Sequence, residues 1–185
     1  MPGQGRPRWR FLWALVCAGP LAPAPPQAGA ADAPQAVRLD AQLAALASFG
    51  PNHVWAVGDR GTIWQTTNGG TSWHLQSANV DARLQSVQFL DAEHGWVAGG
   101  VIDPYTKTSR GILLKTSDGG RHWTSEPRLG LPAIRRIHFV DSKQGWAITC
   151  PATLFPTGLF STSDGGRSWS PVSSAADADW LAGAF

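Results

Sequence analysis

Reactive and metal-binding side chains are scarce in this 185-residue sequence, which has two cysteines, one methionine, one tyrosine and five histidines. It contains no H-E-x-x-H, C-x-x-C, EF-hand or phosphate-binding glycine motif. We therefore expect no metal site and no cofactor. Long apolar runs are also missing: residues 11–19, "FLWALVCAG", fall far short of the roughly 20 residues that a membrane-spanning helix needs. Stable insertion into a membrane is accordingly not expected.

The first 30 residues have the layout of a secretory signal peptide. Three arginines within residues 6–10 precede the apolar run, Pro20 ends it, and residues 28–30 have the A-x-A form of a cleavage site. We interpret residues 1–30 as a signal peptide and residues 31–42 as a linker. The protein is therefore expected to be exported across a membrane, to the periplasm or to the extracellular space.

A surplus of positive charge is absent once the signal peptide is set aside. Cleavage after Ala30 removes three of the 15 basic residues and none of the 13 acidic ones, which leaves 12 against 13 and a formal charge of −1. A nucleic-acid partner is not expected, because such proteins present a strongly basic surface. Cleavage also leaves Cys150 as a single cysteine, so no internal disulfide can form.

Glycine and tryptophan are abundant, with 21 and 10 copies, and both recur in three similar stretches. Residues 66–73 read "TTNGGTSW", residues 116–123 read "TSDGGRHW" and residues 162–169 read "TSDGGRSW". Each stretch is preceded by a phenylalanine and a further tryptophan, namely Phe49 and Trp55, Phe89 and Trp96, and Phe139 and Trp146. Repeats with a period of about 20–50 residues are typical of solenoids and propellers.

Each repeat is interpreted as four short strands, exemplified by "LQSVQFL", "GWVAG", "GILLKTS" and a strand that begins at "HW". Four-stranded units of about 40–50 residues are typical of β-propeller blades. We predict an all-β fold with blades at about 43–78, 83–127 and 133–172 and the first strand of a further blade at 180–185. Three blades cannot close a ring, so we expect a fragment of a larger propeller. Helical periodicity is suggested only at 36–48.

The repeated stretch is expected to be a hairpin between the third and fourth strands of each blade. Its Asn or Asp can accept hydrogen bonds from the turn, its glycine supplies unusual backbone angles, and its tryptophan packs against the hairpin. We assign these residues a structural role, because every copy occupies the same place in its blade and an active site is made only once. The structural positions are Thr66, Asn68, Gly70, Trp73, Thr116, Asp118, Gly120, Trp123, Thr162, Asp164, Gly166 and Trp169.

These stretches are identified as Asp boxes, or BNR repeats, which occur in sialidases, sortilin-type receptors and xyloglucan-degrading enzymes. The combination F-x-D-x-x-x-G-W followed by T-x-D-G-G-x-x-W most resembles the photosystem II stability/assembly factor family, over residues 43–185. The resemblance implies a seven-bladed propeller in the thylakoid lumen or its bacterial equivalent that assists assembly of the reaction-centre complex. It also implies a non-catalytic scaffold with a protein or peptide partner.

Binding is expected on the face opposite the Asp boxes, where the second-to-third and fourth-to-first connections of a propeller meet. The second-to-third connection is the only one that varies in length, and it is longest in the second repeat, "GGVIDPYTKTSRG". The candidate binding residues are Arg60, Arg83, Asp103, Tyr105, Lys107, Arg110, Arg135 and Arg136. They make either a modestly basic surface for a polypeptide or an ordinary solvated loop.

A glycosidase of the sialidase or xyloglucanase type is the alternative function. A sialidase resemblance requires an Arg-Ile-Pro segment and a tyrosine nucleophile, but the sequence has no Arg-Ile-Pro, and its one tyrosine, Tyr105, falls in the long loop. A pair of catalytic carboxyl groups needs a raised pKa on one of them, and nothing around Asp59, Asp81 or Asp103 suggests it. No catalytic residue is therefore assigned. Self-association through exposed blade edges is also expected.

Overall fold

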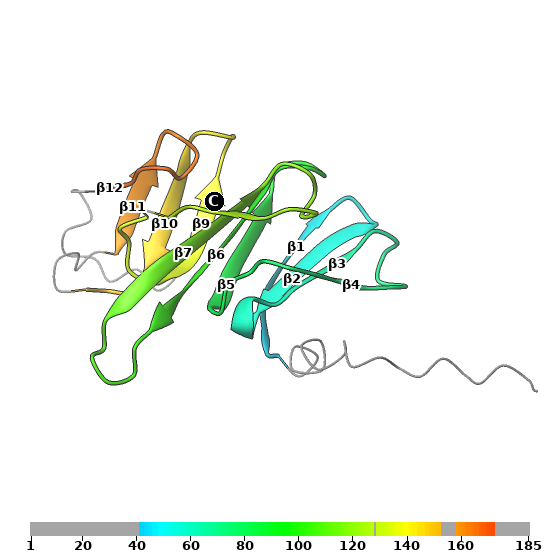
Figure 1. The fold of residues 1–185 in the computed structure, drawn as a ribbon. Coiled ribbons are helices and arrows are strands. Elements are labelled where there is room, and N and C mark those ends of the chain that lie inside the picture. The colour runs from blue at the N-terminus through cyan, green and yellow to red at the C-terminus, as the bar shows by residue number, and fades with distance from the viewer. Residues whose placement is uncertain (1–40, 128, 153–157, 173–185) are drawn as a thin grey trace, which may run out of the picture.

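The computed structural model of the chain describes residues 41–127, 129–152 and 158–172, and these form three four-stranded sheets (Figure 1). The predicted signal peptide and the predicted strand at 180–185 lie outside the described residues. The first sheet contains β1 (Leu43–Phe49), β2 (His53–Gly58), β3 (Ile63–Thr66) and β4 (His74–Gln76), with a short 3-10 turn, η1 (Asp59–Gly61). The second contains β5 (Arg83–Phe89), β6 (Gly95–Ile102), β7 (Ser109–Thr116) and β8 (Thr124–Ser125). The third contains β9 (Ile134–Phe139), β10 (Gly145–Thr149), β11 (Leu159–Thr162) and β12 (Ser170–Pro171).

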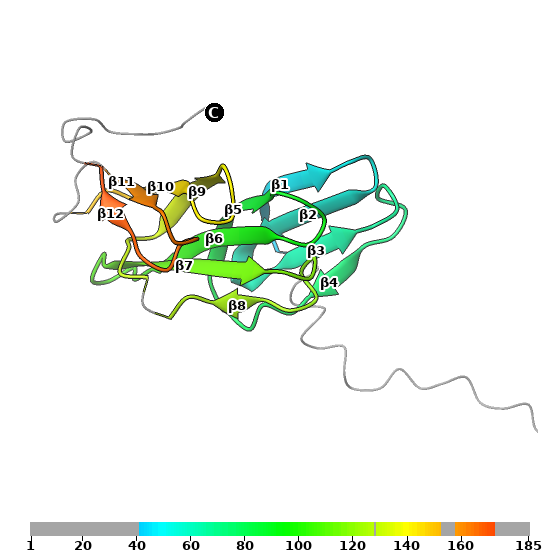
Figure 2. The ribbon, with the colours of Figure 1, turned by 90° about the horizontal axis from the view of Figure 1, so that it is seen from above.

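Each sheet is an antiparallel meander in which neighbouring strands follow one another along the chain. The first strands β1, β5 and β9 contact one another in series, so the sheets form successive blades of an arc (Figures 1 and 2). The predicted all-β propeller architecture is confirmed. The suggestion of a helix at 36–48 is wrong for its described part, because residues from Leu43 onward form β1, paired with β2. No helix among the described residues is long and apolar enough to cross a membrane.

The hydrophobic core lies between the blades. One cluster joins Trp55, Val57 and Ile63 of the first blade to Val97 and Leu114 of the second. An equivalent cluster fills the junction between the second and third blades. Its fully or almost fully buried members include Trp96, Leu113, Ile134, Phe139 and Phe160. Because both faces of the middle blade are covered, each blade depends on its neighbours for most of its apolar burial.

A tryptophan of each second strand forms the centre of each junction. Trp55 stacks on Phe89 of the next blade with ring centroids 3.6 Å apart, and Trp96 stacks on Phe139 with centroids 4.3 Å apart. The Trp55 Nε1 donates a hydrogen bond to the Gly119 carbonyl at 3.2 Å. The Trp96 Nε1 donates in the same way to the Gly165 carbonyl at 3.4 Å. Each stacked pair therefore fixes one blade to the Asp box of the next.

The repeat predicts that the three box tryptophans are equally buried, and this is wrong. Trp123 and Trp169 are half-buried and meet Phe89 and Phe139 edge-on, each with ring centroids 6.1 Å apart. Trp73 is 42% exposed. All three tryptophans do lie on the predicted hairpins, directly before the fourth strands.

Phe49 is not the equivalent of Phe89, although the repeats suggest that it is. Phe49 pairs with His53, which lies two positions before Trp55. Phe89 pairs with Gly95, which lies one position before Trp96. The strand-to-tryptophan spacing of six rather than seven residues shifts the register by one. Such a shift turns a side chain to the other face of the sheet. Ser48 accordingly stands where Phe89 stands in the second blade.

Polar side chains of β5 complete the second junction. Ser86 Oγ accepts a hydrogen bond from the Ile137 N–H at 3.1 Å. Gln88 is bound to Phe139 at both ends of its amide: Oε1 accepts from the backbone N–H at 2.7 Å, and Nε2 donates to the carbonyl at 2.8 Å. These bonds satisfy backbone N–H and C=O groups on the unpaired edge of β9, which is an edge strand of its four-stranded sheet.

Candidate binding face

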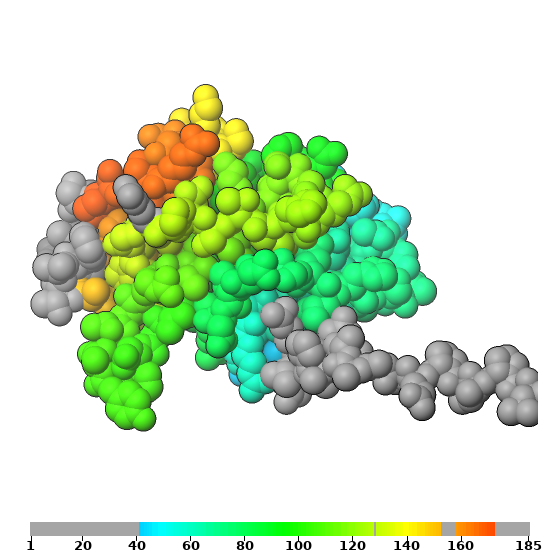
Figure 3. All heavy atoms as spheres, viewed as in Figure 1, coloured from blue at the N-terminus to red at the C-terminus, as the bar shows by residue number. Residues whose placement is uncertain are grey.

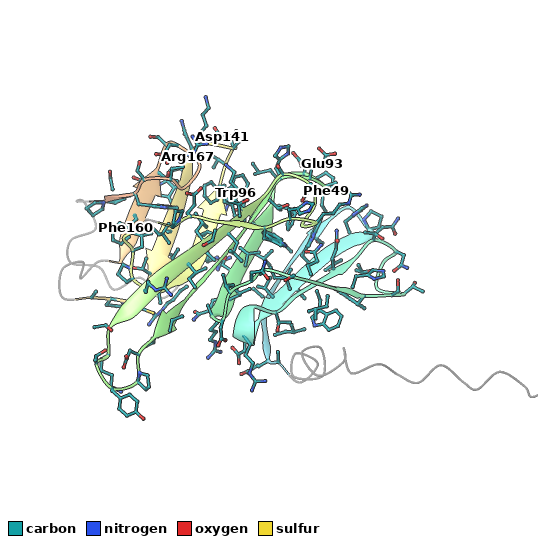
Figure 4. The ribbon with its side chains drawn as sticks, in the orientation of Figure 1. Phe49, Glu93, Trp96, Asp141, Phe160 and Arg167 are labelled. Carbon is teal, nitrogen blue, oxygen red and sulfur yellow. The ribbon has the colours of Figure 1, made fainter. Side chains whose placement is uncertain are left out.

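The hairpins with the Asp boxes gather at one rim of the arc. In each blade the glycine directly after the Asn or Asp donates a backbone N–H hydrogen bond to the turn between the first two strands. These bonds run from Gly69 to Asn52 at 3.1 Å, from Gly119 to Glu93 at 2.8 Å and from Gly165 to Lys143 at 2.8 Å. Glu93, Asp141 and Arg167 mark this rim in Figure 4, with Trp96 below it between the blades. We call residues 50–52, 67–73, 90–94, 117–123, 140–144 and 163–169 the Asp-box face.

Each Asp box is closed by a threonine at its start. Thr116 Oγ1 accepts a hydrogen bond from the Gly120 N–H at 2.8 Å and donates one to Asp118 Oδ1, also at 2.8 Å. Asp118 Oδ1 in turn accepts from the His122 N–H at 3.0 Å. The other two boxes make the same three bonds, from Thr66 and Thr162. The side chains of the box are thus engaged within the hairpin itself.

The box aspartates have lowered pKa values. At Asp164 the Ser168 hydroxyl and backbone N–H both donate to the carboxylate and lower its pKa to about 2. At Asp118 the backbone N–H of His122 is the largest cause, and the pKa lies well below its ordinary value of 3.8. Both carboxyl groups are therefore ionised at neutral pH and accept hydrogen bonds, which is the opposite of what a general acid requires.

Acid should weaken the fold through these boxes. A carboxyl group whose pKa is lower in the folded state stabilises the fold above its unfolded pKa, and that contribution is lost as pH falls toward the folded value. For Asp164 the window runs from about pH 4 down to about pH 2. We expect urea denaturation to show the free energy of unfolding falling across this window. Asp118→Asn/Asp164→Asn should fall less steeply.

Asparagine is chosen as the replacement because Asn68 already occupies the same position in the first box. Its amide oxygen accepts from Thr66 Oγ1 and from the Ser72 N–H, both at 2.9 Å, so an amide satisfies the box without titrating. Asp91, Asp103 and Asp141, whose pKa values are also lowered by turn N–H groups, supply a remaining slope. An unchanged slope in the double variant would contradict the assignment.

The connections at the opposite rim are joined to one another by backbone hydrogen bonds. The Gly61 N–H donates to the Ala82 carbonyl and the Gly111 N–H to the Leu131 carbonyl, both at 2.8 Å. The Cys150 N–H donates to the Ala133 carbonyl at 2.7 Å. The second-to-third connection of each blade therefore meets the fourth-to-first connection, as expected. We call residues 59–62, 77–83, 103–110, 126–136 and 150–152, where described, the loop face.

Arg60 and Arg83 lie together on the first part of the loop face. Arg60 is exposed in the turn η1, with a positive φ of 58°. Arg83 begins β5, and its Nε lies 3.4 Å from Asp59 Oδ1, with 55% of the arginine side chain exposed. An ion pair this exposed adds little to stability. The exposed part of the Arg83 side chain is accessible to a ligand.

Arg110 lies beside a groove at the junction of the first two blades. The groove has a volume of about 440 Å³ and runs between the connections that follow β4 and β8, above the start of β7. Its lining includes Asn79, Asp81, Arg110, Ile112, Glu126 and Leu129. The mixture of one guanidinium, two carboxyl groups and exposed backbone suits a polypeptide better than a purely anionic ligand.

Asp103, Tyr105 and Lys107 form the tip of a hairpin between β6 and β7 that projects from the loop face (Figures 1 and 3). Asp103 Oδ1 accepts hydrogen bonds from the Tyr105 and Thr106 N–H groups at 2.8 and 2.9 Å. These donors lower the pKa of Asp103. Its carboxylate thus shapes the turn.

Arg135 and Arg136 lie near the start of β9, where Arg135 is half-buried and Arg136 is exposed. Arg136 pairs with Ile148 just as Ser86 pairs with Ala98, so it occupies the position from which Ser86 reaches the next blade. The structure therefore brings the predicted residues to one face but not to one point. Arg83 is near the first junction, Arg110 beside the groove, and Arg136 on the far side of the third blade.

Charge differs between the two faces. Among the described residues the loop face carries six lysine and arginine side chains and four carboxyl groups, a balance of +2, and the Asp-box face carries three and five, a balance of −2. Hydrogen bonds lower the pKa values of Asp91, Asp103, Asp118, Asp141 and Asp164. No group of three or more histidine, cysteine or acidic residues in the described part of the chain could hold a metal ion.

Comparison with known proteins identifies the family. Residues 31–133, more than half of the sequence, match the family model described as "Photosynthesis system II assembly factor YCF48". The chain belongs to the YCF48 family. A search of curated proteins finds no match.

Solved structures agree with this assignment. A structure described as YCF48 bound to D1 peptide is 27% identical and has a TM-score of 0.54, with 70% of this chain and 39% of that chain covered. YCF48 from Cyanidioschyzon merolae is 21% identical with a TM-score of 0.52, over 71% of this chain and 39% of that one. An ancestral GH74 enzyme is 17% identical with a TM-score of 0.51, over 71% of this chain and 18% of the enzyme. The chain thus spans well under half the length of the YCF48 structures that it matches.

The sequence does not identify the junction residues as a set. Trp55 and Trp96 were visible in the sequence as a recurring G-W or V-W pair, but their partners lie more than thirty positions away. In the sequence, Ser86 and Gln88 are only the polar half of an alternating strand, whereas in the structure both form hydrogen bonds to the next blade. A usable signal was the fixed spacing of 16 residues from each box tryptophan to the next phenylalanine, because it makes consecutive blades meet in the same register.

Proposed function

We propose that this chain is an exported, non-catalytic binding module that recognises a polypeptide segment through its loop face, as a scaffold for assembly of a membrane protein complex. The observation that carries the proposal is its 27% identity to a YCF48 structure described as bound to D1 peptide. The signal-peptide pattern of residues 1–30 supports export. The likeness covers 39% of that chain, so the proposal extends only to contacts that the three described blades can make.

The chemistry of the loop face supports a polypeptide as ligand. Arg110 and the groove beside it offer a guanidinium, two carboxyl groups and backbone at a junction of connections. Arg135 and Arg136 add positive charge at the next blade, where the surface is exposed. Arginine is favoured in interfaces because its planar group binds carboxylates and backbone carbonyls at several points.

A glycosidase function gains little from the same observations. The GH74 structure shares the fold at 17% identity, which carries no information on activity. The pKa values of Asp103, Asp118 and Asp164 are lowered, whereas glycoside hydrolysis uses a general acid with a raised pKa.

Charge reversal at Arg135 and Arg136 should weaken polypeptide binding. We expect Arg135→Glu/Arg136→Glu to lower the affinity for a labelled D1 peptide about tenfold, because two attractive charges become repulsive. Fluorescence anisotropy of the labelled peptide, titrated with the full chain, measures the change. The salt dependence of binding should fall in parallel, since fewer charge contacts remain to be screened.

The matched control is Arg121→Glu/Arg167→Glu. Both arginines are exposed, and both lie on the Asp-box face, so the net charge of the chain changes equally while the loop face is untouched. This control should bind the peptide like the unaltered chain. Equal loss in both double variants would indicate a general electrostatic effect, and no loss in either would refute the choice of face.

A further inference from the structure

The hairpin formed by residues 101–110 extends beyond the body of its blade. Its strands β6 and β7 have eight residues each, whereas β2 and β10 have six and five and β3 and β11 have four each. The pairing of β6 with β5 ends at Gly100, so Val101 and Ile102 are paired only with β7. Figure 3 shows this segment standing clear of the surrounding surface.

The tip of the hairpin is held in one conformation. The Asp103 N–H donates to the Thr108 carbonyl at 2.9 Å, and the Lys107 N–H donates back to the Asp103 carbonyl at 3.0 Å. The Asp103 carboxylate accepts from the Tyr105 and Thr106 N–H groups. Because the backbone of the tip is already ordered, binding through the Tyr105 side chain costs little backbone conformational entropy.

Exposed hydrophobic side chains lie on both faces of the ribbon and at its tip. Tyr105 at the tip is 92% exposed, Ile102 is 52% exposed and Val101 is 37% exposed. Adjacent residues of a strand point to opposite faces, so Val101 and Ile102 cannot both contact one flat protein surface. A fluid medium that encloses the ribbon can cover both faces and the tip together.

The charges on the hairpin match an anionic layer. Lys107 and Arg110 are its basic residues, and both are exposed. Its single acidic residue, Asp103, is engaged by the turn. Tyrosine is enriched at the boundary between lipid headgroups and acyl chains, and lysine and arginine nearby are attracted to anionic lipids.

We propose that hairpin 101–110 docks reversibly in the interfacial layer of an anionic phospholipid bilayer. Tyr105 and Ile102 enter the boundary between headgroups and acyl chains, and Lys107 and Arg110 contact the lipid phosphates. Docking in this way turns the whole loop face toward the membrane surface. The proposal shares Arg110 with the groove proposed for the polypeptide, but its apolar contacts come from the tip of the hairpin and it requires no polypeptide partner.

Vesicle co-sedimentation of the full chain tests the proposal. We expect binding to vesicles of phosphatidylcholine mixed with phosphatidylglycerol, and about tenfold weaker partitioning for Ile102→Ser/Tyr105→Ser. Lys107→Glu/Arg110→Glu should lower partitioning to the mixed vesicles and leave partitioning to pure phosphatidylcholine vesicles unchanged. Val140→Ser and Lys143→Glu/Arg167→Glu are the matched controls, since these exposed side chains lie on the Asp-box face. Both controls should partition like the unaltered chain.

Tyr105 also reports on the unaltered protein, because it is the one tyrosine of the sequence. We expect mixed vesicles to slow its nitration by tetranitromethane severalfold. Binding through the apolar run at 11–19 would leave this rate unchanged, and an unchanged rate overturns the proposal. Partitioning of the Ile102→Ser/Tyr105→Ser variant equal to that of the unaltered chain overturns it too. Loss of D1 peptide binding in that variant, with vesicle binding unaltered, would show instead that the hairpin is a protein contact.

Discussion

Trp96→Ala is expected to lower the free energy of unfolding by about 3–5 kcal/mol, the usual cost of truncating a buried tryptophan. Trp96 is 1% exposed and stacks on Phe139 with an interplanar angle of 13°. Its Nε1 donates to the Gly165 carbonyl of the next blade, and Lys115 Nζ lies 5.4 Å from the centre of its ring. The alanine variant loses all of these contacts and leaves a cavity between two blades. Urea denaturation followed by tryptophan fluorescence measures the change.

Trp73→Ala is the matched control for this prediction. The substitution is the same, but Trp73 is 42% exposed and belongs to the Asp-box hairpin of the first blade. Its loss should cost well under half as much as the loss of Trp96, since far less apolar area returns to water. Trp96→Phe should fall between the two, because it keeps a ring against Phe139 and loses the N–H donor. Equal destabilisation by both alanine variants would show that the junction is not the main source of stability.

The blades could be predicted because the Asp box is local in sequence. The threonine, the Asn or Asp and the glycine that close each hairpin lie within five positions, so Thr116, Asp118 and Gly120 carry their structure in one short stretch. Repetition of that stretch then predicts strands on both sides of it. The hydrogen bonds of all three boxes follow the same pattern, independent of what lies around them.

The junctions could not be predicted in the same way. Trp55 bonds to Gly119, 64 positions away, and no local pattern names that partner. The exposure of Trp73 also depends on its surroundings, because Trp123 gains Gln76 of the preceding blade as a hydrogen-bond acceptor at 3.2 Å. The spacing from Phe49 to Trp55 is one residue shorter than in the other repeats. Its effect on the face to which Phe49 points follows only from the pairing register of β1 and β2.

The candidate site was predictable only as a face. Loop length and strand order placed Arg83, Arg110 and Arg136 on the side opposite the Asp boxes. Arg83 and Arg110 belong to the second blade and Arg136 to the third, so their spacing depends on how the sheets are arranged. The groove beside Arg110 is formed by connections from two different blades. The exposed apolar side chains of the 101–110 hairpin followed from neither charge nor repeat pattern.

Gly166→Ala should destabilise the fold by about 2–5 kcal/mol, for two reasons that add. The first is the backbone, because Gly166 has a φ of 91°, a conformation that side chains disfavour. The second is packing, since a Cβ at this position would lie 2.5 Å from Leu113 Cδ2 of the preceding blade. Leu113 is fully buried in the second junction and cannot move aside without disturbing it.

Gly70→Ala separates these two causes. Gly70 has the same φ of 91° in the same position of its box, but the nearest atom to an added Cβ is Trp73 Nε1 at 3.8 Å, an ordinary contact. It should therefore cost only the backbone term, about 1–2 kcal/mol. The difference between the two variants in urea denaturation measures the closeness of the blades at the second junction. A difference near zero would mean that the glycine of the Asp box serves the turn alone, and that the preceding blade yields to an added methyl group without loss.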